Sequence, residues 1–339
     1  MLYFLSDYTE GCHPKILEAL SRTNLVSQPG YGEDIWCASA AEKIRSLCGE
    51  VDVYFLSGGT QANLVVISAL LRRHEAVIAA ETGHIAVHEA GAIEFTGHKV
   101  LTLPSHAGKL DAGELEAYLR RFYADATHEH MPCPGMVYLS QPTELGTLYT
   151  KSELTALYET CRRWELPLFL DGARLGYGLM SPACDMTIRD VATLTDVFSI
   201  GGTKVGALCG EALVFRRGVM PRGFVTMTKQ QGAMLAKGRL LGVQFDTLFT
   251  DDLYWDISRR AVADAMALKA AFAEKGYPLF ADSPTNQQFV ILTPDQKERL
   301  ARNVAFNVWE ALPDGRVAVR FVTSWATTHE DVRKLEELL

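Results

Sequence analysis

Two reactive side chains stand directly after short apolar runs in the middle of the sequence. Lys204 ends the turn Gly201-Gly202-Thr203-Lys204, which follows the run 196–200. A lysine that such a turn carries into a crevice loses hydration, so its pKa falls and its amine becomes a nucleophile toward carbonyl carbons. Asp171 ends the run PLFLD at 167–171. A carboxylate there caps a helix, meets a cation, or holds a proton on a heterocyclic nitrogen.

Two further turns have residue types that suit an anion and an aromatic ring. The turn Ser57-Gly58-Gly59-Thr60-Gln61 follows the apolar run VDVYFL, and His84 follows the run AVIAA in Thr82-Gly83-His84-Ile85. Glycines let the backbone approach an anion, and the next helix offers free amides. The first turn lacks the spacing of a Walker A loop and the third glycine of a dinucleotide-binding motif. Taken singly, each of the four has an ordinary structural explanation as well.

The elements around these residues alternate between strands and helices. Apolar runs predict strands at 51–56, 76–80, 100–103, 136–140, 167–171 and 196–200, with helices at 61–73, 115–123 and 151–164. Such alternation is typical of a mainly parallel sheet covered by helices on both faces. Ligands of open parallel sheets bind beyond the carboxyl ends of the strands. We therefore expect the four turns to meet at one edge of the sheet.

The pattern changes after residue 245. A long helix is predicted at 258–275, alternating strands at 288–292 and 316–323, and a last helix at 328–339. We predict an α/β protein with a large domain, residues 1–245 with the N-terminal segment included, and a smaller α+β domain, residues 246–339.

Charge and composition exclude several classes of protein. The net charge of −8 argues against binding to nucleic acid or to an anionic membrane surface. The longest apolar run, 64–71, is too short to span a bilayer, and the first residues lack the pattern of a secretory signal. Seven scattered cysteines fit reduced thiols, so we expect a cytoplasmic protein.

Taken together, the four turns resemble the site of an enzyme that depends on pyridoxal 5′-phosphate (PLP). Their order along the chain, and the 33 residues from Asp171 to Lys204, are typical of the aspartate-aminotransferase-like class, fold type I. Within it the sequence resembles the threonine aldolase / β-eliminating lyase family, and its low-specificity L-threonine aldolases in particular. The matching stretches are Ser6-Asp7, 31–34, SGGTQAN at 57–63, GHIAVHEAGA at 83–92, LDGARL at 170–175, GGTKVG at 201–206 and RFVTSW at 320–325.

The resemblance implies a role for each residue of the cofactor site. Lys204 is expected to form the Schiff base with PLP, Asp171 to pair with the pyridine nitrogen, and His84 to stack on the ring. The turn is expected to hold the phosphate through Gly58, Gly59, Thr60 and Gln61.

For the substrate, the resemblance implies a carboxylate clamp of Ser6, Arg174 and Arg320, since arginine forks bind carboxylates at two points. His130 lies about where the family places a second histidine near the substrate hydroxyl. The expected reaction is retro-aldol cleavage of a β-hydroxy-α-amino acid to glycine and an aldehyde, with His84 or His130 as the base.

The sequence departs from the family pattern at two places. Residues 140–144 read Ser-Gln-Pro-Thr-Glu where the family often has Glu-Asn-Thr-His, and Gly-Gly-Thr precedes the lysine in place of Leu-Ser. These departures leave the preferred β-substituent and the threo/erythro selectivity open.

Other functions remain as alternatives. A PLP-dependent aminotransferase or β-eliminating lyase would share the cofactor site, and a non-enzymatic binding module would need none of it. A metal hydrolase using His84 and His88 is a distant alternative, because the acid of H-x-x-x-H-E lies outside the histidine pair and no third ligand is evident.

The basic stretch 229–239 falls where this fold usually crosses a dimer interface. Lys229 or Lys237 could reach the cofactor phosphate of a neighbouring subunit, or the stretch could be a solvated basic surface. The resemblance implies a homodimer or homotetramer with shared active sites.

Overall fold

Seven strands form the central sheet of the larger lobe, in the order β2-β8-β7-β6-β5-β3-β4. The computed structural model describes all residues, 1–339. The strands are β2 (Val51–Leu56), β3 (Glu75–Ala80), β4 (Val100–Leu103), β5 (Cys133–Ser140), β6 (Leu168–Asp171), β7 (Val197–Gly201) and β8 (Glu211–Arg216). Neighbouring strands are parallel except at β8, which runs antiparallel to β2 and β7. The expected mainly parallel sheet is confirmed, and β8 is an addition that the sequence did not reveal.

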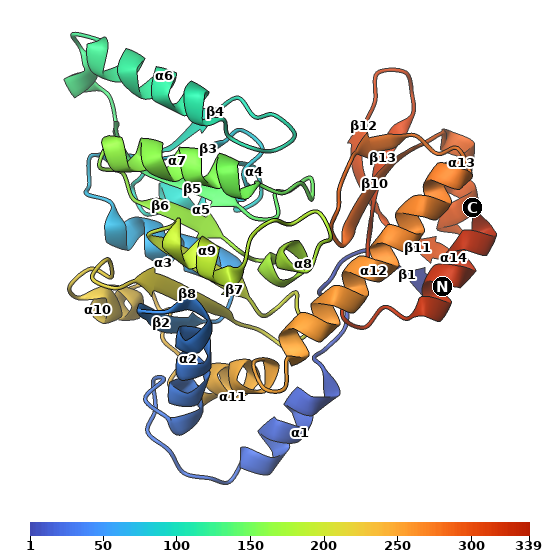
Figure 1. Cartoon of the computed structure of the whole chain (residues 1–339), viewed down its shortest axis with the longest axis horizontal. Coiled ribbons are helices and arrows are strands. Elements are labelled where there is room, and N and C mark those ends of the chain that lie inside the picture. Colours follow the sequence, from blue (N-terminus) through green and yellow to red (C-terminus); the bar gives the residue numbers. More distant parts are fainter.

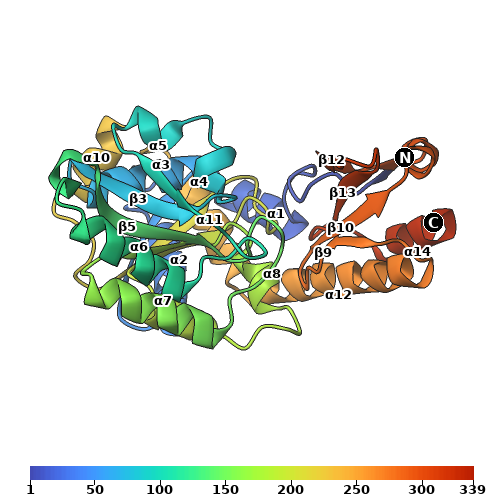
Figure 2. The same cartoon turned by 90° about the horizontal axis from the view of Figure 1, so that it is seen from above.

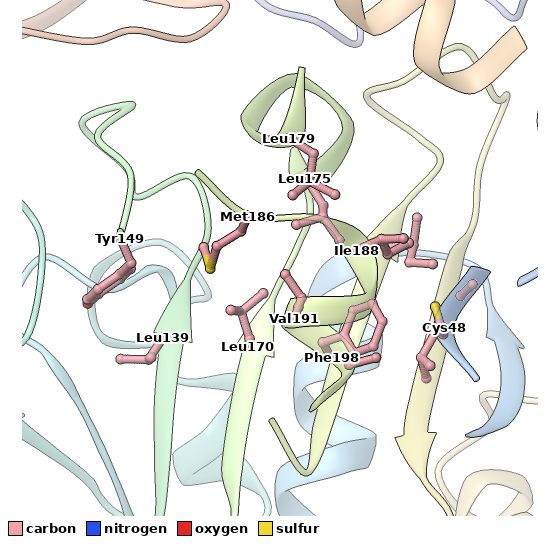
Figure 3. Close-up of a cluster of buried hydrophobic side chains, with 14 of the residues drawn as sticks. Cys48, Leu139, Tyr149, Leu170, Leu175, Leu179, Met186, Ile188, Val191 and Phe198 are labelled. Atoms are coloured by element: carbon pink, nitrogen blue, oxygen red, sulfur yellow. The ribbon is translucent and has the colours of Figure 1, made fainter. Parts of the chain in front are cut away.

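Alternating side chains of the strands bury both faces of this sheet. Val137 and Leu139 of β5 belong to one apolar cluster, whereas Met136 and Tyr138 belong to another. Successive side chains of a strand point to opposite faces, so an all-apolar strand needs cover on both sides. Figure 3 shows part of the first cluster, in which the strand side chains Leu139, Leu170 and Phe198 lie beside Leu175, Ile188 and Val191.

Helices of the larger lobe supply that cover (Figure 1). The first cluster includes side chains from α1 (Pro14–Thr23), α2 (Ile35–Cys48), α6 (Ala112–Ala124), α7 (Lys151–Arg163), α8 (Leu175–Leu179), α9 (Ile188–Thr193) and α11 (Arg239–Leu248). The second includes side chains from α3 (Gly59–Leu70), α4 (His84–Val87), α5 (Ala92–Phe95) and α10 (Phe224–Gln230). A short 3-10 helix, η1 (His128–His130), precedes β5.

Helix α3 begins two residues earlier than expected and ends three residues earlier. Gly58 adopts extended backbone and caps α3, and Leu71 returns to extended backbone at its other end. The earlier start matters for the site, because it places the helix N-terminus at Gly59, inside the glycine turn.

The smaller lobe contains a four-stranded antiparallel sheet in the order β12-β13-β10-β9. Its elements are α12 (Leu253–Glu274), β9 (Leu279–Ala281), β10 (Gln287–Leu292), α13 (Pro294–Ala301), β11 (Val304–Ala305), β12 (Asn307–Ala311), β13 (Val317–Val322) and α14 (His329–Leu338). Figure 2 shows the long helix α12 running along this lobe. No helix of the protein has both the length and the apolar composition needed to cross a bilayer.

The first residues of the chain join this smaller lobe, which corrects the expected placement of the N-terminal segment in the large domain. Strand β1 (Leu2–Tyr3) pairs in parallel with β11, and the Phe4 side chain packs in the core of the smaller lobe. The Val322 amide also donates a hydrogen bond to the Phe4 carbonyl (2.9 Å). This pairing joins residues about 300 positions apart, so no local pattern reveals it. The pairing also holds the chain in place directly before Ser6 and Asp7.

Candidate active site

One cleft opens where the strands of the large sheet end. The carboxyl ends of β2, β3, β5, β6 and β7 lie at the same edge as the amino end of the antiparallel strand β8. The cleft is lined by Gly59, Asn63, His84, Ser140, Pro142, Thr143, Glu144, Asp171, Ala173, Arg174 and Lys204. Five residues that the sequence predicts from four separate segments, Gly59, His84, Asp171, Arg174 and Lys204, therefore share it.

Lys204 reaches the cleft from a turn that requires glycine. A Cβ added at Gly201 would lie 2.1 Å from the Ala173 carbonyl oxygen, so this strand end packs directly on the backbone that follows Asp171. Burial, together with the nearby charge of Arg174, lowers the pKa of Lys204. A lysine amine with a lowered pKa is neutral for a larger fraction of the time and can attack a carbonyl carbon.

Asp171 is buried at the end of β6 and is held by donors on both oxygens. Its Oδ2 accepts from Asn63 Nδ2 (2.9 Å) and Tyr138 OH (2.7 Å), and its Oδ1 accepts from the Ala173 amide (2.9 Å). Burial by itself raises the pKa of a carboxyl, but the charge of His84 and the hydrogen bonds from Asn63 and Tyr138 outweigh it. The pKa of Asp171 consequently lies below its ordinary value, and the carboxylate stays charged.

His84 is linked to Asp171 through two further side chains. Its Nδ1 lies 2.7 Å from Oε1 of the buried Glu89, and the same oxygen accepts from Asn63 Nδ2 (2.7 Å). Because Asn63 also donates to Asp171, one amide bridges the two carboxylates. The bridge fixes the imidazole and the Asp171 carboxylate relative to each other.

The glycine turn leaves amides free at the start of α3. The first helical bond runs from the Ala62 amide to the Gly58 carbonyl, so the amides of residues 59–61 lie outside the helical ladder. A Cβ built at Gly58 or Gly59 would meet no atom within 4 Å, which means that the space before the turn is open. The Gln61 side-chain oxygen accepts from the Ser57 amide (3.1 Å) and braces the turn. This arrangement suits an anion such as phosphate.

Arg174 forms an ion pair with a residue that was not expected in the site. Its Nε and Nη2 donate to the two carboxylate oxygens of buried Asp7 (2.6 and 2.9 Å), which also accepts from Asn286 (3.0 Å). Burial opposes ionisation of Asp7, but the charge and hydrogen bonds of Arg174 dominate and lower the pKa of Asp7. The Nε/Nη2 edge of the guanidinium is therefore occupied by Asp7, and Nη1 is not used in this ion pair.

Arg320 and Ser6 carry buried polar atoms with no partner in the protein. Arg320 donates from Nη1 to Gln287 Oε1 (3.0 Å), whereas its Nε and the Ser6 hydroxyl have no hydrogen-bond partner. Burial lowers the pKa of Arg320 to about 10, and the charge of Arg174 acts in the same direction. Buried donors without partners are costly, so these atoms indicate a place for an anionic ligand group.

The chain is similar to known proteins over nearly its whole length. A profile of the beta-eliminating lyase family matches residues 4–293. The low-specificity L-threonine aldolase of Pseudomonas sp. strain NCIMB 10558 is 33% identical over 342 residues, covering 98% of this chain and 95% of that protein. The solved structure of Leishmania major threonine aldolase is 43% identical and superposes with a TM-score of 0.96, covering 100% and 98% of the two chains.

The chain belongs to the threonine aldolase / β-eliminating lyase family. The solved structure of Thermus thermophilus aspartate aminotransferase superposes with a TM-score of 0.71 at 16% identity, covering 100% of this chain and 90% of that one. This likeness concerns the fold alone, and it confirms the aspartate-aminotransferase-like α/β architecture, fold type I.

The structure does not bring His130 to the cleft of its own chain. His130 is exposed in η1, three residues before β5 begins, whereas Ser140 at the other end of β5 lines the cleft. An eight-residue strand is about 25 Å long at roughly 3.3 Å per residue. The family resemblance placed His130 near the substrate hydroxyl, but the strand separates them by its full length.

Lys229 and Lys237 are also outside this cleft. Lys229 lies on α10 with its amine 4.5 Å from the centre of the Tyr31 ring, and Lys237 is exposed in the loop before α11. Neither side chain touches the residues of the candidate site within the chain.

His88 does not join His84 as part of a metal centre in the structure. The two imidazole rings lie 5.6 Å apart, and His88 contacts Trp309 of the smaller lobe (6.1 Å between ring centres). No group of three or more His, Cys, Asp or Glu side chains is placed to hold a metal ion.

Several site residues were missed in the sequence although their neighbours were found. Asn63 and Glu89 lie inside the matching stretches 57–63 and 83–92, and Asp7 lies beside Ser6. The position of Asn63 was a usable signal for a site residue. It lies one helical turn after Gly59 in α3, and residues four apart share a helix face. Tyr138 had no such signal, since its hydroxyl reaches Asp171 across neighbouring strands.

Proposed function

We propose that this protein is a PLP-dependent aldehyde-lyase that cleaves β-hydroxy-α-amino acids, threonine or allo-threonine among them, to glycine and an aldehyde. The observation that carries the proposal is one cleft holding the Lys204 amine, whose pKa is lowered, and the charged Asp171 carboxylate. The names of the relatives from Pseudomonas and Leishmania support the substrate class.

The residues of the cleft fit PLP. Lys204 would hold the aldehyde carbon, Asp171 would keep a proton on the pyridine nitrogen, and the open turn at Gly58 and Gly59 would take the phosphate with Thr60 and Gln61. When bound, PLP supplies an acceptor for the electron pair that is released at the substrate Cα.

Asp171 can serve the pyridine nitrogen because its surroundings keep it ionised. Its donors Asn63 and Tyr138 satisfy one oxygen and the Ala173 amide the other, so the carboxylate neither rotates nor takes up a proton. His84 is the proposed stacking partner of the ring, and its Nδ1 contact with Glu89 fixes the imidazole plane.

Arg320, Arg174 and Ser6 are the proposed clamp for the substrate carboxylate. The unpartnered Nε of Arg320 and the hydroxyl of Ser6 would donate to it, and Nη1 of Arg174 is free because Asp7 occupies the other two nitrogens. A fixed carboxylate sets the rotation about Cα. The bond from Cα to Cβ, rather than the bond to the carboxylate, is then held ready to break.

We also propose a cytoplasmic homodimer or homotetramer. All seven cysteines are free thiols, which suits a reducing compartment. Tyr31, Val225 and Met234 line an apolar hollow on the surface of the larger lobe, beside Lys229. A second subunit would cover such a surface.

The test is to load the purified chain with PLP, reduce it with borohydride and map the modified peptide by mass spectrometry. The expected modification lies on Lys204, and Lys204→Ala should show none. The loaded protein should release glycine and an aldehyde in equal amounts from L-threonine, L-allo-threonine or phenylserine. Modification of another lysine would contradict the site, and release of a 2-oxo acid without glycine would indicate an aminotransferase or a β-eliminating lyase.

A further inference from the structure

A carboxyl group to which the proposed function gives no role lines the same cleft. Glu144 lies four residues beyond Ser140, the last residue of β5, in the segment 140–144 that departs from the family pattern. It shares the cleft with His84, Asp171 and Lys204. An ionisable side chain in a cleft of this kind is a candidate for proton transfer.

Two hydrogen bonds orient this carboxyl group. The His84 backbone amide (2.8 Å) and the Ser140 hydroxyl (2.6 Å) both donate to Oε1 of Glu144. No group of the protein donates to Oε2. With Oε1 engaged twice, Oε2 is the carboxylate oxygen that is left without a hydrogen bond from the protein.

The segment that carries Glu144 is fixed by a tight turn. The Thr143 amide donates to the Thr147 carbonyl (2.9 Å), the Gly146 amide donates to the Thr143 carbonyl (2.8 Å), and the two threonine hydroxyls lie 2.6 Å apart. Glu144 is therefore held in place before any substrate binds, as proton transfer in a transition state requires.

The surroundings of Glu144 favour a group that both accepts and returns a proton. Burial raises the pKa of Glu144 above its ordinary value and the charge of Asp171 acts in the same direction, against the Ser140 hydrogen bond and the charge of His84. Proton transfer is most effective when the pKa of the group approaches the working pH.

His84 has less freedom to take this role. Its Nδ1 contacts Glu89, and the same histidine is the proposed stacking partner of the cofactor ring. A ring that lies flat on the cofactor presents its face, and not a nitrogen lone pair, to the ring beneath it. Oε2 of Glu144 has no such hydrogen-bond partner in the protein and no proposed contact with the face of the cofactor ring.

We propose that Glu144 is a catalytic residue that accepts the β-hydroxyl proton of the substrate on Oε2 and releases it to solvent after cleavage. This inference rests on the proposed lyase function. The O–H bond of the substrate breaks as a new O–H bond forms on Glu144. The oxygen electrons form the C=O bond of the aldehyde, and the Cα–Cβ bond breaks with its electron pair left at Cα. Glu144 then releases this proton to solvent, and a separate proton from solvent bonds to Cα to give glycine, so protons and electrons balance.

The first test is Glu144→Gln, an amide that keeps an oxygen for the Ser140 and His84 donors. Cleavage of L-threonine should fall at least 100-fold in kcat, within the range of general acid–base catalysis. Exchange of the glycine Cα proton in D2O, which involves no β-hydroxyl, should stay within about threefold. The affinity for PLP should be unchanged. The matched control is Glu81→Gln, an exposed glutamate at the end of β3 outside the cleft, which should leave cleavage unchanged.

A second measurement needs no turnover. Infrared pH titration of the cofactor-free protein should contain carboxyl bands of both Glu144 and Glu211 that titrate above the ordinary glutamate range, and Glu144→Gln should remove the first while the Glu211 band remains. If the glutamine variant folds poorly, Glu144→Asp supplies the comparison, because a shorter acid should retain part of the cleavage.

The outcomes separate the two proposals. Cleavage within threefold of wild type in Glu144→Gln would overturn the role of Glu144, and so would an equal loss of cleavage and glycine exchange, which indicates a structural defect. An unchanged infrared titration would also overturn it. If the wild-type protein itself releases no glycine and aldehyde, the lyase function fails instead.

Discussion

Asp171→Asn removes one charge from the centre of the cleft with almost no change in size. In the wild-type protein every partner of the carboxylate is a donor: Asn63 and Tyr138 on Oδ2, and the Ala173 amide and the Ser199 hydroxyl (3.5 Å) on Oδ1. An asparagine NH2 placed at either position faces a donor that cannot accept, either Asn63 Nδ2 or the Ala173 amide. The variant must leave at least one buried donor unsatisfied.

The substitution has two separate effects, one on stability and one on catalysis. One unsatisfied buried polar group costs about 1–3 kcal/mol in the free energy of unfolding. The loss of a charge that faces the pyridine nitrogen of PLP costs on the order of 4 kcal/mol in the transition state, or roughly a thousandfold in kcat. PLP should still bind, because Lys204 and the glycine turn are unchanged.

The assay compares kcat for aldehyde release, PLP occupancy by absorbance and thermal unfolding. The matched control is Asp196→Asn, another buried aspartate, which accepts from Arg162 Nη2 (2.5 Å) and the Leu168 amide (2.8 Å) but lies at the opposite edge of the sheet, before β7. The control should lose stability while kcat stays within about threefold. If Asp171→Asn binds PLP and turns over within about tenfold of wild type, Asp171 serves as a helix cap and the reasoning is refuted.

Three further changes test other parts of the site. Burial raises the pKa of Glu211 to about 8 although the charge of Lys204 opposes it, so folding favours the protonated form and stability is lost as pH rises from 4.5 through 8. Glu211→Gln should therefore raise Tm of the cofactor-free protein progressively above wild type between pH 5 and pH 9, and a constant difference would contradict this. Asp7→Asn should lower the free energy of unfolding by about 3–5 kcal/mol in denaturant titrations, because it leaves Arg174 without its buried partner; a loss below about 0.5 kcal/mol would show that the pair is unimportant. His130→Ala should keep kcat within about threefold, whereas a loss above tenfold would show that His130 reaches the cleft of another subunit.

The sequence revealed the site residues that local patterns encode. Asp171, Lys204 and His84 each follow an apolar strand, and the order of strands and helices predicts that parallel strand ends meet at one edge. The glycine turn at 58–61 was found for the same reason. These features need no knowledge of how distant segments pair.

The remaining features depend on contacts between distant residues. Asn63 lies 108 positions from Asp171, and Asp7 lies 167 positions from Arg174. The antiparallel direction of β8 is set by its pairing with β2 and β7 and cannot be read from its own residues, whereas its apolar run 212–215 was a usable signal for a strand. The partners of Asp171 and Arg174 decide their charge and orientation, so the sequence identified the reactive groups but not what controls them.

Incubation of the PLP-loaded protein with uniformly 13C-labelled L-threonine, followed by 13C NMR, tests the proposed reaction most directly. Cleavage between Cα and Cβ predicts two two-carbon products in equal amounts, glycine with coupled C1 and C2 and acetaldehyde with coupled C3 and C4. Lys204→Ala should give neither. A four-carbon 2-oxo acid in which all the labelled carbons remain joined, with no labelled glycine, would contradict the proposed function.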